Sequence, residues 1–432
     1  MKFNNELTDI NLSFPVFKAT LKNGLKILLI EDRTLPITVF FTTFQVGSRF
    51  ENTDAKIKTG TSHLFEHLMF NGSKKYPKGK FDSLIEYCGG YSNAWTSKDQ
   101  TTFYEVFSPN NIEMILELEL DRFNNLEITH DVLESERKVV MEERRLRIDN
   151  SISGKMWELL YQSAYKKHPY CSPVLGWMND IKSITLEDCY YFYNTFYSTN
   201  NAIVTLAGDF NTDKIIPILE TAYGNNQPIN IPEFPKQKWE LNGQEKRIKF
   251  RKPAELEMVI IGYPGCQGDS PDAPVIDMLM YILVDGETSR LHKKLVYEKE
   301  IILEAFGDFH GGFCRELITF GYRIHPEYKY IKVLKSFDEQ IDNICNNGIT
   351  LSELEKSRNG LLTSMVEEMS TLANKAGNLI HYESLFGDYN KSFEIIQVYA
   401  GITKEDIQRV AQKYLGNKKR TIVHLIPEIQ NN

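Results

Sequence analysis

Short β-rich apolar runs occur at intervals along the first hundred residues of the chain. Runs of Val, Ile, Phe and Thr bounded by Gly, Pro or Asn predict strands. They lie at residues 25–31, 37–46, 93–96 and 101–107. A short helix is predicted between them at residues 81–87, where two glycines end the helical pattern. The pattern predicts a domain in which strands and helices alternate.

Helical spacing replaces this pattern after residue 110. Apolar residues at 112, 115, 116 and 120 lie on one side of a predicted helix. A second helix is predicted from about Thr129 to Ile148, where Glu, Arg and Lys predominate. Charge runs of this kind usually form a solvated helix face crossed by salt bridges, and that is the default interpretation here.

One helix, turn and strand pattern occurs twice. The sequence ITLEDCYYFYNTFYSTNNAIVTLAGDF covers residues 184–210, and ITKEDIQRVAQKYLGNKKRTIVHLIP covers residues 402–427, at an offset of 218 residues. Thr185 and Asp188 predict a capping box at the start of the first helix. A pattern repeated at an offset of about half the chain length indicates a duplicated domain, because solenoid repeats have far shorter periods.

The duplication predicts an N-terminal domain at residues 1–225 and a homologous C-terminal domain at residues 246–432. The intervening residues 226–245 begin with a stretch rich in Pro and Asn and are predicted to be a linker. In the second copy, residues 256–263 predict a strand and residues 273–284 a helix. The expected fold class is α+β, with two αβ domains that each have a mixed or antiparallel sheet and helices on one side.

Composition excludes several classes of protein. Hydrophobic residues make up 42% and charged residues 25% of the 432 residues, as in ordinary soluble globular proteins. The net charge is −8 and no long basic block occurs, so no nucleic-acid partner is expected. The six cysteines are scattered without a CxxC pair, so reduced thiols are expected rather than a disulfide framework.

Targeting signals are also missing from the sequence as it stands. No apolar run approaches the roughly 18 residues of a membrane span, so no membrane partner is expected. Residues 1–14 have no apolar segment behind a basic start, which argues against a secretory signal. We therefore expect a cytoplasmic protein, or a periplasmic one if a signal peptide has been removed.

The stretch GTSHLFEHLMF, at residues 60–70, places His63, Glu66 and His67 at positions i, i+3 and i+4. On a helix these side chains share one face, and the apolar residues between them form the other. Two imidazoles one turn apart can bind one zinc ion at about 2.0–2.1 Å, while the carboxylate holds a water. HxxEH is the form used by inverted zincins. The alternative, two histidines on an ordinary surface helix, is rare by chance with nine histidines in 432 residues.

A catalytic zinc ion needs a third protein ligand. Glu136 and Glu143 in the charged helix are seven residues apart, which is almost two turns, so they share a face that could meet the histidine helix. Spacing alone leaves Glu134 and Glu142 open as well.

The second copy lacks the histidine motif. The offset of 218 residues places Tyr281 where His63 stands, and no histidine pair occurs near it. The C-terminal domain is therefore expected to keep the scaffold without the metal. Its most distinctive segment is DGETSRLHKKLVYEKE at residues 285–300, in which Arg290 lies near a helix start. On residue type alone, an exposed arginine in an ion pair is the favoured interpretation of Arg290.

With these features together, the chain resembles the pitrilysin/insulinase/mitochondrial-processing-peptidase family of inverted zinc metallopeptidases, in its short two-domain form. The resemblance covers nearly the whole chain. The segments that carry it are GSRFE at 47–51, HLFEHLMFNGS at 63–73, NAWTSKDQTTFY at 93–104, ERKVVMEE at 136–143, HPY at 168–170 and SRL at 289–291. In this family two αβ domains make half of a clam-shell chamber, and two chains make the working unit.

The resemblance implies roles for particular residues. It implies that one zinc ion per chain is bound by His63, His67 and Glu143. Glu66 would be the general base, and Glu136 a supporting acidic residue of the catalytic site. The assignment of Glu143 and Glu136 agrees with the shared helix face.

Substrate contacts are implied as well. The edge strand that accepts the peptide backbone by β-addition would consist of Asn93, Ala94, Trp95 and Thr96. Arg290 would reach the peptide from the second domain. Where the family often has a tyrosine that helps to hold substrate, this chain has Glu304. The contribution of its own second domain to substrate binding is therefore in question, whereas the metal half is intact.

These observations predict a zinc metalloendopeptidase that hydrolyses extended peptides held in a chamber. The expected partners are a peptide substrate and a second chain, either in a homodimer or in a heterodimer with a related subunit that lacks HxxEH. The alternative is a non-catalytic structural or assembly subunit of the same fold, although such chains tend to lose HxxEH or the distant Glu. A non-catalytic zinc-binding module would need four protein ligands, and the sequence offers no fourth.

Overall fold

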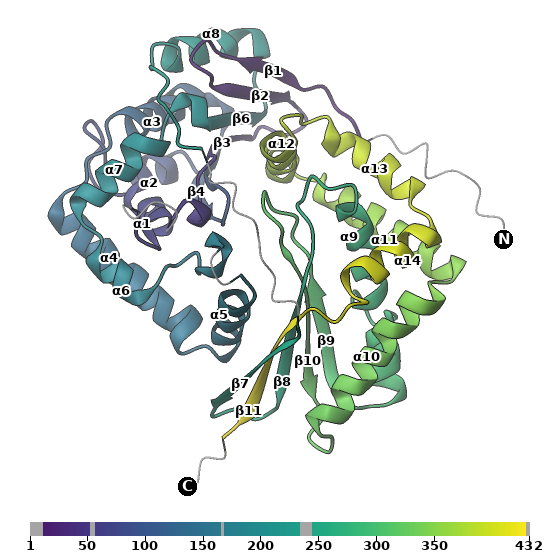
Figure 1. The fold of residues 1–432 in the computed structure, drawn as a ribbon. Coiled ribbons are helices and arrows are strands. Elements are labelled where there is room, and N and C mark those ends of the chain that lie inside the picture. Colours follow the sequence, from purple (N-terminus) through teal and green to yellow (C-terminus); the bar gives the residue numbers. More distant parts are fainter. Residues whose placement is uncertain (1–11, 52–56, 166–167, 234–243, 429–432) are drawn as a thin grey trace.

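Two sheets, each with its own set of helices, form the two halves of the chain (Figure 1). The computed structural model describes residues 12–51, 57–165, 168–233 and 244–428. Residues 1–11, which belong to the segment expected to carry no signal, lie outside the described residues. So does 234–243, the middle of the predicted linker. The domain boundaries at 225 and 246 stay predictions.

The first sheet has six strands in the order β1-β2-β6-β3-β5-β4. They are β1 (Phe17–Thr20), β2 (Lys26–Glu31), β3 (Thr38–Phe44), β4 (Tyr91–Thr96), β5 (Thr101–Phe107) and β6 (Ala202–Gly208). β6 runs parallel to β2 and antiparallel to β3. The sheet is therefore mixed, and β4 forms one of its edges.

The second sheet has five strands in the order β7-β11-β8-β10-β9. They are β7 (Lys246–Lys252), β8 (Met258–Pro264), β9 (Ile302–Asp308), β10 (Leu317–Ile324) and β11 (Thr421–Pro427). β11 runs parallel to β7 and antiparallel to β8, as β6 does with β2 and β3. The strand order and directions of the first sheet thus recur after its extra strand β1, which confirms the predicted duplication and the mixed sheets.

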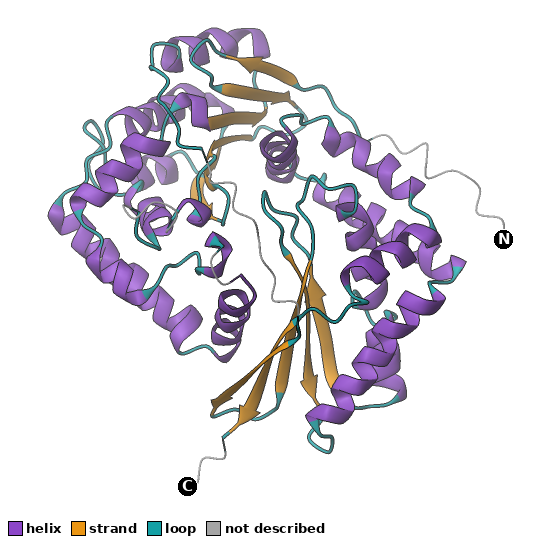
Figure 2. Ribbon diagram, in the orientation of Figure 1, coloured by secondary structure: helices purple, strands orange, loops and turns teal. Residues whose placement is uncertain are grey.

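In both halves most of the helices lie between the last two strands in the chain, that is between β5 and β6 and between β10 and β11. The N-terminal half contains α1 (Thr61–Leu68), α2 (Lys80–Tyr87), α3 (Ile112–Asn124), α4 (His130–Arg144), α5 (Ile152–Tyr165), α6 (Met178–Ser183), α7 (Leu186–Phe196) and α8 (Thr212–Tyr223). The C-terminal half contains α9 (Ala273–Leu283), α10 (Tyr330–Asn347), α11 (Leu351–Glu368), α12 (Leu372–Phe386), α13 (Lys391–Gly401) and α14 (Lys404–Tyr414). Figure 2 shows the second sheet with the helices of its own half other than α12 along one side.

The repeated segments begin with the same helix cap. Thr185 and Asp188 exchange hydrogen bonds at the start of α7, and Thr403 and Asp406 do so at the start of α14. A side-chain oxygen that accepts from a free backbone N–H stabilises a helix end by about 1 kcal/mol. The predicted capping box is confirmed, and its copy lies 218 residues later.

One helix from each half packs on the sheet of the other half. α12 contacts β3 and β6, and α5 contacts β8 and β11. Ala376, Leu379 and Ile380 of α12 are buried against one face of the first sheet, which contributes Leu28, Ile30, Val39, Phe41, Ile203 and Ala207. Met156 and Leu160 of α5 are buried against the second sheet. We call α5 and α12 the exchanged helices; they cover the sheet faces that each half's own helices leave open (Figure 1).

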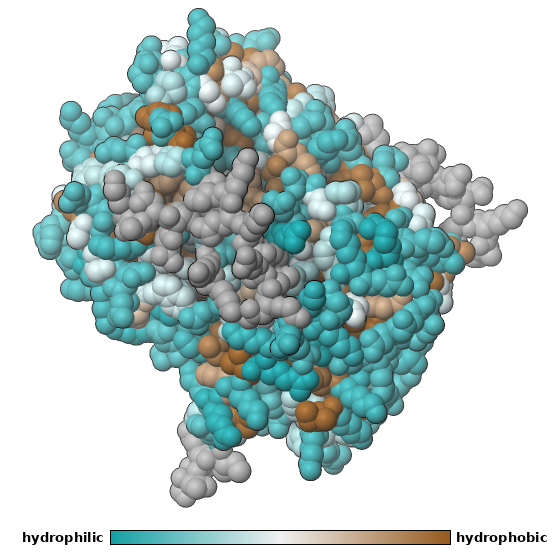
Figure 3. Space-filling view, viewed as in Figure 1, coloured by the Kyte–Doolittle hydropathy of each residue, from teal (hydrophilic) through white to brown (hydrophobic). Residues whose placement is uncertain are grey.

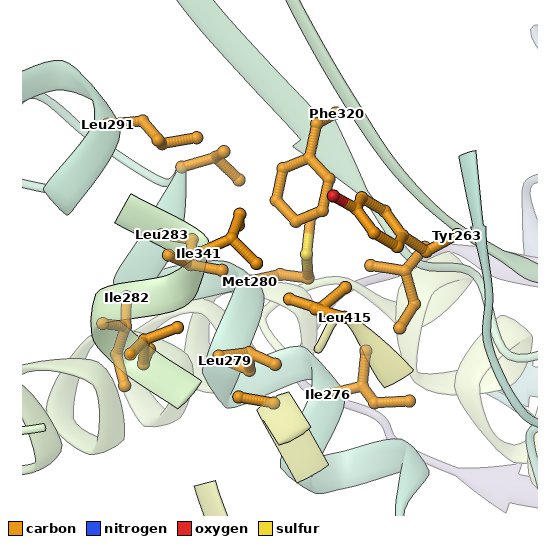
Figure 4. Close-up of a cluster of buried hydrophobic side chains, with 14 of the residues drawn as sticks. Tyr263, Ile276, Leu279, Met280, Ile282, Leu283, Leu291, Phe320, Ile341 and Leu415 are labelled. Atoms are coloured by element: carbon orange, nitrogen blue, oxygen red, sulfur yellow. The ribbon is translucent and has the colours of Figure 1, made fainter. Parts of the chain in front are cut away.

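The other face of each sheet packs on the helices of its own half. In the C-terminal half, Leu279 and Met280 of α9 lie against the aromatic rings of the sheet, Tyr263 and Phe320 (Figure 4). These two rings contact each other edge to face, with centroids 5.9 Å apart. Burial of each large apolar side chain contributes roughly 1.5–3 kcal/mol. Apolar packing therefore fixes both helix layers.

The charged helix changes its type near its predicted end. α4 stops at Arg144 and the chain continues as a wider π-helical turn, Arg145–Asp149. At this turn the chain reverses into α5, and Gly154 packs against the carbonyl of Arg147 so closely that a Cβ would not fit. The predicted helical extent to Ile148 is confirmed, although the last turn is π-helical rather than α-helical.

The surface in Figure 3 is largely hydrophilic, and its apolar residues form small, separate patches. Within the described residues, none of the helices combines the length and the apolar character that crossing a membrane requires.

Candidate metal centre

Helix α1 presents His63, Glu66 and His67 on the face opposite its apolar side, as the sequence predicts. Leu64 and Phe65 are buried in the core of the N-terminal half. This packing fixes the rotation of the helix about its axis. The three polar side chains are thereby directed towards α4, which packs against α1.

Glu143 of α4 faces both histidines. Its Oε2 atom lies 3.6 Å from Nε2 of His63 and 3.6 Å from Nε2 of His67. The ligand atoms of these three residues all lie within 4.8 Å of one another, and the described part of the chain holds no other group of His, Cys, Asp and Glu side chains gathered in this way. We call these three candidate ligands the ligand triad.

The ligand triad fits zinc. Two imidazole nitrogens and one carboxylate oxygen, with a fourth position left open, are typical of catalytic zinc sites. Two ligands of a tetrahedral zinc ion lie about 3.3 Å apart. The observed separations of 3.6 Å therefore need only a small adjustment to share one ion.

Glu136 holds the other side of the His67 ring. Its Oε2 atom lies 3.5 Å from Nδ1 of His67, and Lys78 Nζ lies 3.3 Å from its Oε1. A carboxylate behind a ligating imidazole fixes the orientation and tautomer of the ring, so that the opposite nitrogen is free to bind metal. Glu136 is thus placed to direct Nε2 of His67 towards Glu143.

The two carboxylates that spacing left open do not join the ligand triad. Glu134 forms an ion pair with Arg137 one turn later. Glu142 is exposed and lies 2.8 Å from Arg145. Glu142 lines the same cleft as Glu143, but it does not belong to the group of possible ligands. Spacing in the sequence could not distinguish these carboxylates, because the rotation of α4 depends on its packing.

Charges within the centre shift its pKa values. Burial lowers the pKa of His63 to about 4, and the neighbouring His67 adds to this effect. Burial also acts to lower the pKa of His67, but its hydrogen bonds to Glu136 and Glu143 prevail and raise the pKa to about 9. The hydrogen bond to His67 in turn holds the pKa of Glu143 below its usual value. Neutral His63 and ionised Glu143 are the forms that bind a metal, whereas His67 would have to release its proton when a metal binds.

Arg147 is a contact of the ligand triad that the sequence did not reveal. Its guanidinium lies 3.0 Å from Oε1 of Glu143, one turn along the helical stretch. Because Arg147 holds Oε1, the other oxygen of Glu143 faces the histidines. The signal was the spacing of four residues between opposite charges, which is common on any charged helix.

Glu66 connects α1 to the edge strand β4. The hydroxyl of Thr96 donates a hydrogen bond of 2.6 Å to Oε2 of Glu66. Burial raises the pKa of Glu66, and the Thr96 hydrogen bond acts against this rise. Its second oxygen, Oε1, is left to contact a water or a substrate.

These residues share one cleft of about 1020 Å³. The cleft is lined by the ligand triad, by Glu66 and Glu136, and by all four residues of the predicted peptide-binding strand, Asn93, Ala94, Trp95 and Thr96. β4 forms an edge of its sheet, as β-addition of a peptide requires. Val139 and Leu146 add exposed apolar surface to the cleft wall.

Arg290 is not brought into this cleft. Its guanidinium forms a two-pronged ion pair with Glu353, at 2.6 and 2.8 Å, and donates to Asn343 and to the carbonyl of Gly348. The structure therefore shows the ion pair favoured on residue type alone, although the Arg290 side chain is largely buried rather than exposed. Its contact with a bound peptide stays a prediction, and would require Arg290 to give up some of these bonds.

Glu304 lies on the second edge strand, β9. Its Oε1 atom is 3.0 Å from Nε of Arg323 on β10, and both side chains are largely exposed. The pair joins neighbouring strands on the sheet surface, where a tyrosine would leave Arg323 without this partner.

Two family models match the chain. The model described as "Insulinase (Peptidase family M16)" matches residues 26–176, and "Peptidase M16 inactive domain" matches residues 183–361. The first match contains the ligand triad. The second lies mostly in the C-terminal half, which lacks the histidine motif. Together they cover most of the chain.

Curated proteins of similar length align with nearly the whole of this chain. A "Zinc protease PqqE" of Helicobacter pylori is 29% identical over 418 residues, which cover 94% of this chain and 92% of that protein. The "Mitochondrial-processing peptidase subunit beta" of Homo sapiens is 23% identical, with coverage of 97% and 86%.

Solved structures share the fold. The crystal structure of a protease from Helicobacter pylori superposes with a TM-score of 0.87 at 27% identity, and covers 96% of this chain and 100% of that one. The periplasmic protease PqqL from Escherichia coli superposes with a TM-score of 0.80 at 15% identity. This chain covers 48% of PqqL, which is therefore about twice as long.

Proposed function

This chain belongs to the insulinase family of peptidases, family M16, and we propose that it is a zinc-dependent endopeptidase of the inverted HxxEH type. One observation carries the proposal: the ligand triad and Glu66 line the same cleft as the edge strand β4. Ligands, a general base and a peptide-binding edge are the parts that metal-assisted hydrolysis of a peptide bond requires.

His63, His67 and Glu143 would hold the metal, with Glu136 and Arg147 fixing two of these side chains. Bound zinc supplies a Lewis acid that polarises the scissile carbonyl and makes an attacking water more acidic. Glu66 accepts the proton of that water and passes it to the leaving amine. Because Glu66 lies between the two histidines on one helix, its distance from the metal position is set by the helix itself.

Thr96 fixes the carboxylate end of the Glu66 side chain, whose other end is fixed by the helix backbone. The 2.6 Å hydrogen bond occupies Oε2, so Oε1 is the oxygen that exchanges the proton. Thr96 also belongs to β4, so the base is tied to the strand along which the peptide lies. A peptide that adds to Asn93, Ala94, Trp95 and Thr96 would lie at a fixed distance from the Glu66 carboxylate. This arrangement favours cleavage of extended segments.

A second chain completes the chamber in this proposal. PqqL of Escherichia coli has about twice the length of this chain and the same fold, and the human relative is named as a subunit. Both relatives are consistent with an assembly in which two units of this chain's length enclose one peptide. The ion pairs that engage Arg290 and Glu304 favour a partner that contributes substrate contacts, either a second copy or a related subunit without HxxEH.

The alternative is an assembly subunit without catalytic activity, as the description "inactive domain" indicates for the model matched by residues 183–361. The complete ligand triad and Glu66 favour the peptidase. The direct test incubates the purified chain with a mixed peptide pool, with and without a chelator, followed by zinc readdition. Cleavage that the chelator abolishes and zinc restores is expected. Zinc binding without cleavage, alone or with a related subunit, would favour the assembly role.

A further inference from the structure

The helix that carries the histidines has no cap of its own. Its N-cap residue is Gly60, at φ +86° in the left-handed region, and no side chain of the helix start accepts a hydrogen bond there. A Cβ on Gly60 would come 2.7 Å from the carbonyl oxygen of Leu175. The packing therefore excludes the Ser, Thr or Asp that commonly caps a helix.

Glu51 supplies the missing cap from outside the helix. Its Oε2 atom accepts from the N–H of Gly60 and its Oε1 atom from the N–H of Ser62, each at 2.7 Å. The side chain is buried, with 1% of the residue exposed. A carboxylate that bridges two N–H groups at a helix N-terminus forms charge-assisted hydrogen bonds and complements the helix dipole. His63 follows Ser62 directly in the chain.

The segment that ends in Glu51 is fixed at its other end to the substrate edge. Ser48 N–H donates to the carbonyl of Ser97 at 3.2 Å, and Arg49 N–H donates to that of Lys98 at 2.8 Å. Ser97 and Lys98 lie in the turn between β4 and β5, directly after Thr96. Residues 47–51 thus connect the turn beside β4 with the start of α1.

We propose that Glu51 is a positioning residue of the metal centre: by holding the N-terminus of α1 at a fixed distance from β4, it orients His63 and His67 for zinc and Glu66 for the peptide. This inference rests on the proposed peptidase function. Glu51 touches neither metal nor peptide and acts through the helix. Outer groups that orient metal ligands typically change metal affinity by 10–100-fold when they are removed.

The test replaces Glu51 by Gln, which keeps the shape but offers one acceptor and one donor to two N–H groups. Burial raises the pKa of Glu51 to about 7 against the effect of the Ser62 and Gly60 N–H groups, so measurements are made at pH 8. We expect zinc affinity, measured by competition with a chelating dye, to fall by about 10–100-fold. In zinc-saturated enzyme kcat should fall with little change in KM, because β4 itself is not altered. Glu51→Asp, which keeps the carboxylate with a shorter reach, should restore part of the affinity.

Glu383→Gln is the matched control. Glu383 is as deeply buried, on α12, and pairs with Lys18 and Lys26 at 2.7 and 2.9 Å. Its replacement should lower the melting temperature of the protein without changing zinc affinity. Should Glu51→Gln not yield folded protein, Glu51→Asp carries the test.

The outcomes separate the two proposals. Wild-type zinc affinity and kcat in a folded Glu51 variant would overturn the positioning role. An equal loss of zinc affinity in Glu383→Gln would also overturn it, since general destabilisation would then account for both. If the wild-type chain itself does not bind zinc, the proposed function fails, and that result is read before any variant is compared.

Discussion

The hydroxyl of Thr96 lies 2.6 Å from Oε2 of Glu66, so the edge strand of the first sheet is hydrogen-bonded directly to the expected general base. We predict that Thr96→Val, which keeps the shape of the side chain, lowers kcat by about tenfold, the kinetic equivalent of losing one charge-assisted hydrogen bond. Zinc content should not change. Thr96→Ser keeps the hydroxyl and should retain most of the activity; equal losses in both variants would contradict the role of this bond.

Zinc binding should depend on Glu143 and not on its neighbour in the chain. Glu143→Gln is expected to lower zinc affinity by more than the roughly 10–100-fold typical of outer partners, because it removes a ligand. Glu136→Gln should give a loss within that range. Glu142→Gln alters an exposed carboxylate paired with Arg145 and is the control. Metal analysis after dialysis measures all three, and stoichiometric zinc in Glu143→Gln would shift the ligand to Glu136 or Glu142.

Glu66→Gln should separate metal binding from hydrolysis. The amide cannot accept the proton of the attacking water, so we expect peptide turnover to fall by roughly 10²–10⁴-fold. The zinc content and melting temperature should stay near those of the wild type. Turnover comparable to the wild type would remove Glu66 from the role of general base.

The ion pair of Arg290 and Glu353 predicts a pH-dependent contribution to stability. Burial alone would raise the pKa of Glu353, but the hydrogen bonds from Arg290 and Thr350 outweigh burial and lower the pKa to about 2. A carboxylate whose pKa is lower in the folded state stabilises the fold above its ordinary value of 4.5 and loses this contribution as the pH falls towards 2.

Glu353→Gln should therefore lower the free energy of unfolding at pH 7 by on the order of 1–2 kcal/mol, after allowance for partial exposure. The difference from the wild type should shrink as the pH falls from about 4.5 towards 2. Urea denaturation at several pH values measures it. A difference that does not vary with pH would mean that the ion pair contributes little.

Assembly is the remaining prediction. We expect light scattering to give a particle of twice the 50.0 kDa chain mass or a complex with a related subunit. The isolated chain should cleave peptides weakly and a partner without HxxEH should increase the rate. A monomer that cleaves peptides at full rate would contradict this expectation; a fully active homodimer would show that the chain needs no other subunit.

The sequence predicts the parts of the metal centre that lie within one helix. His63, Glu66 and His67 share a face because helical geometry dictates it, and the apolar residues between them determine which face is buried. Spacing limited the third ligand to a few glutamates of the charged helix, and the resemblance to the family then indicated Glu143. These predictions rest on the helical spacing of residues that are close together in the sequence.

Contacts between distant segments were not predictable in this way. Glu51 accepts hydrogen bonds from Gly60 and Ser62, which lie 9 and 11 residues later in the chain, and no short-range pattern in the sequence predicts these contacts. The partner of Arg290 is 63 residues away, and a charge pattern does not show which of many carboxylates it meets. The exchanged helices α5 and α12 have ordinary apolar faces, which indicate that each helix is covered but not by which sheet.

The exchanged helices also bear on how the chain is made. The strands of the first sheet are complete once residue 208 has left the ribosome, yet the sheet face of Leu28, Val39 and Phe41 stays bare until α12 has been synthesised. The nascent N-terminal half therefore cannot mature ahead of the C-terminal half, although domains commonly fold in order of synthesis. Severed near residue 240, the two fragments should each aggregate when produced alone and regain solubility when produced together, because each supplies the helix that the other lacks.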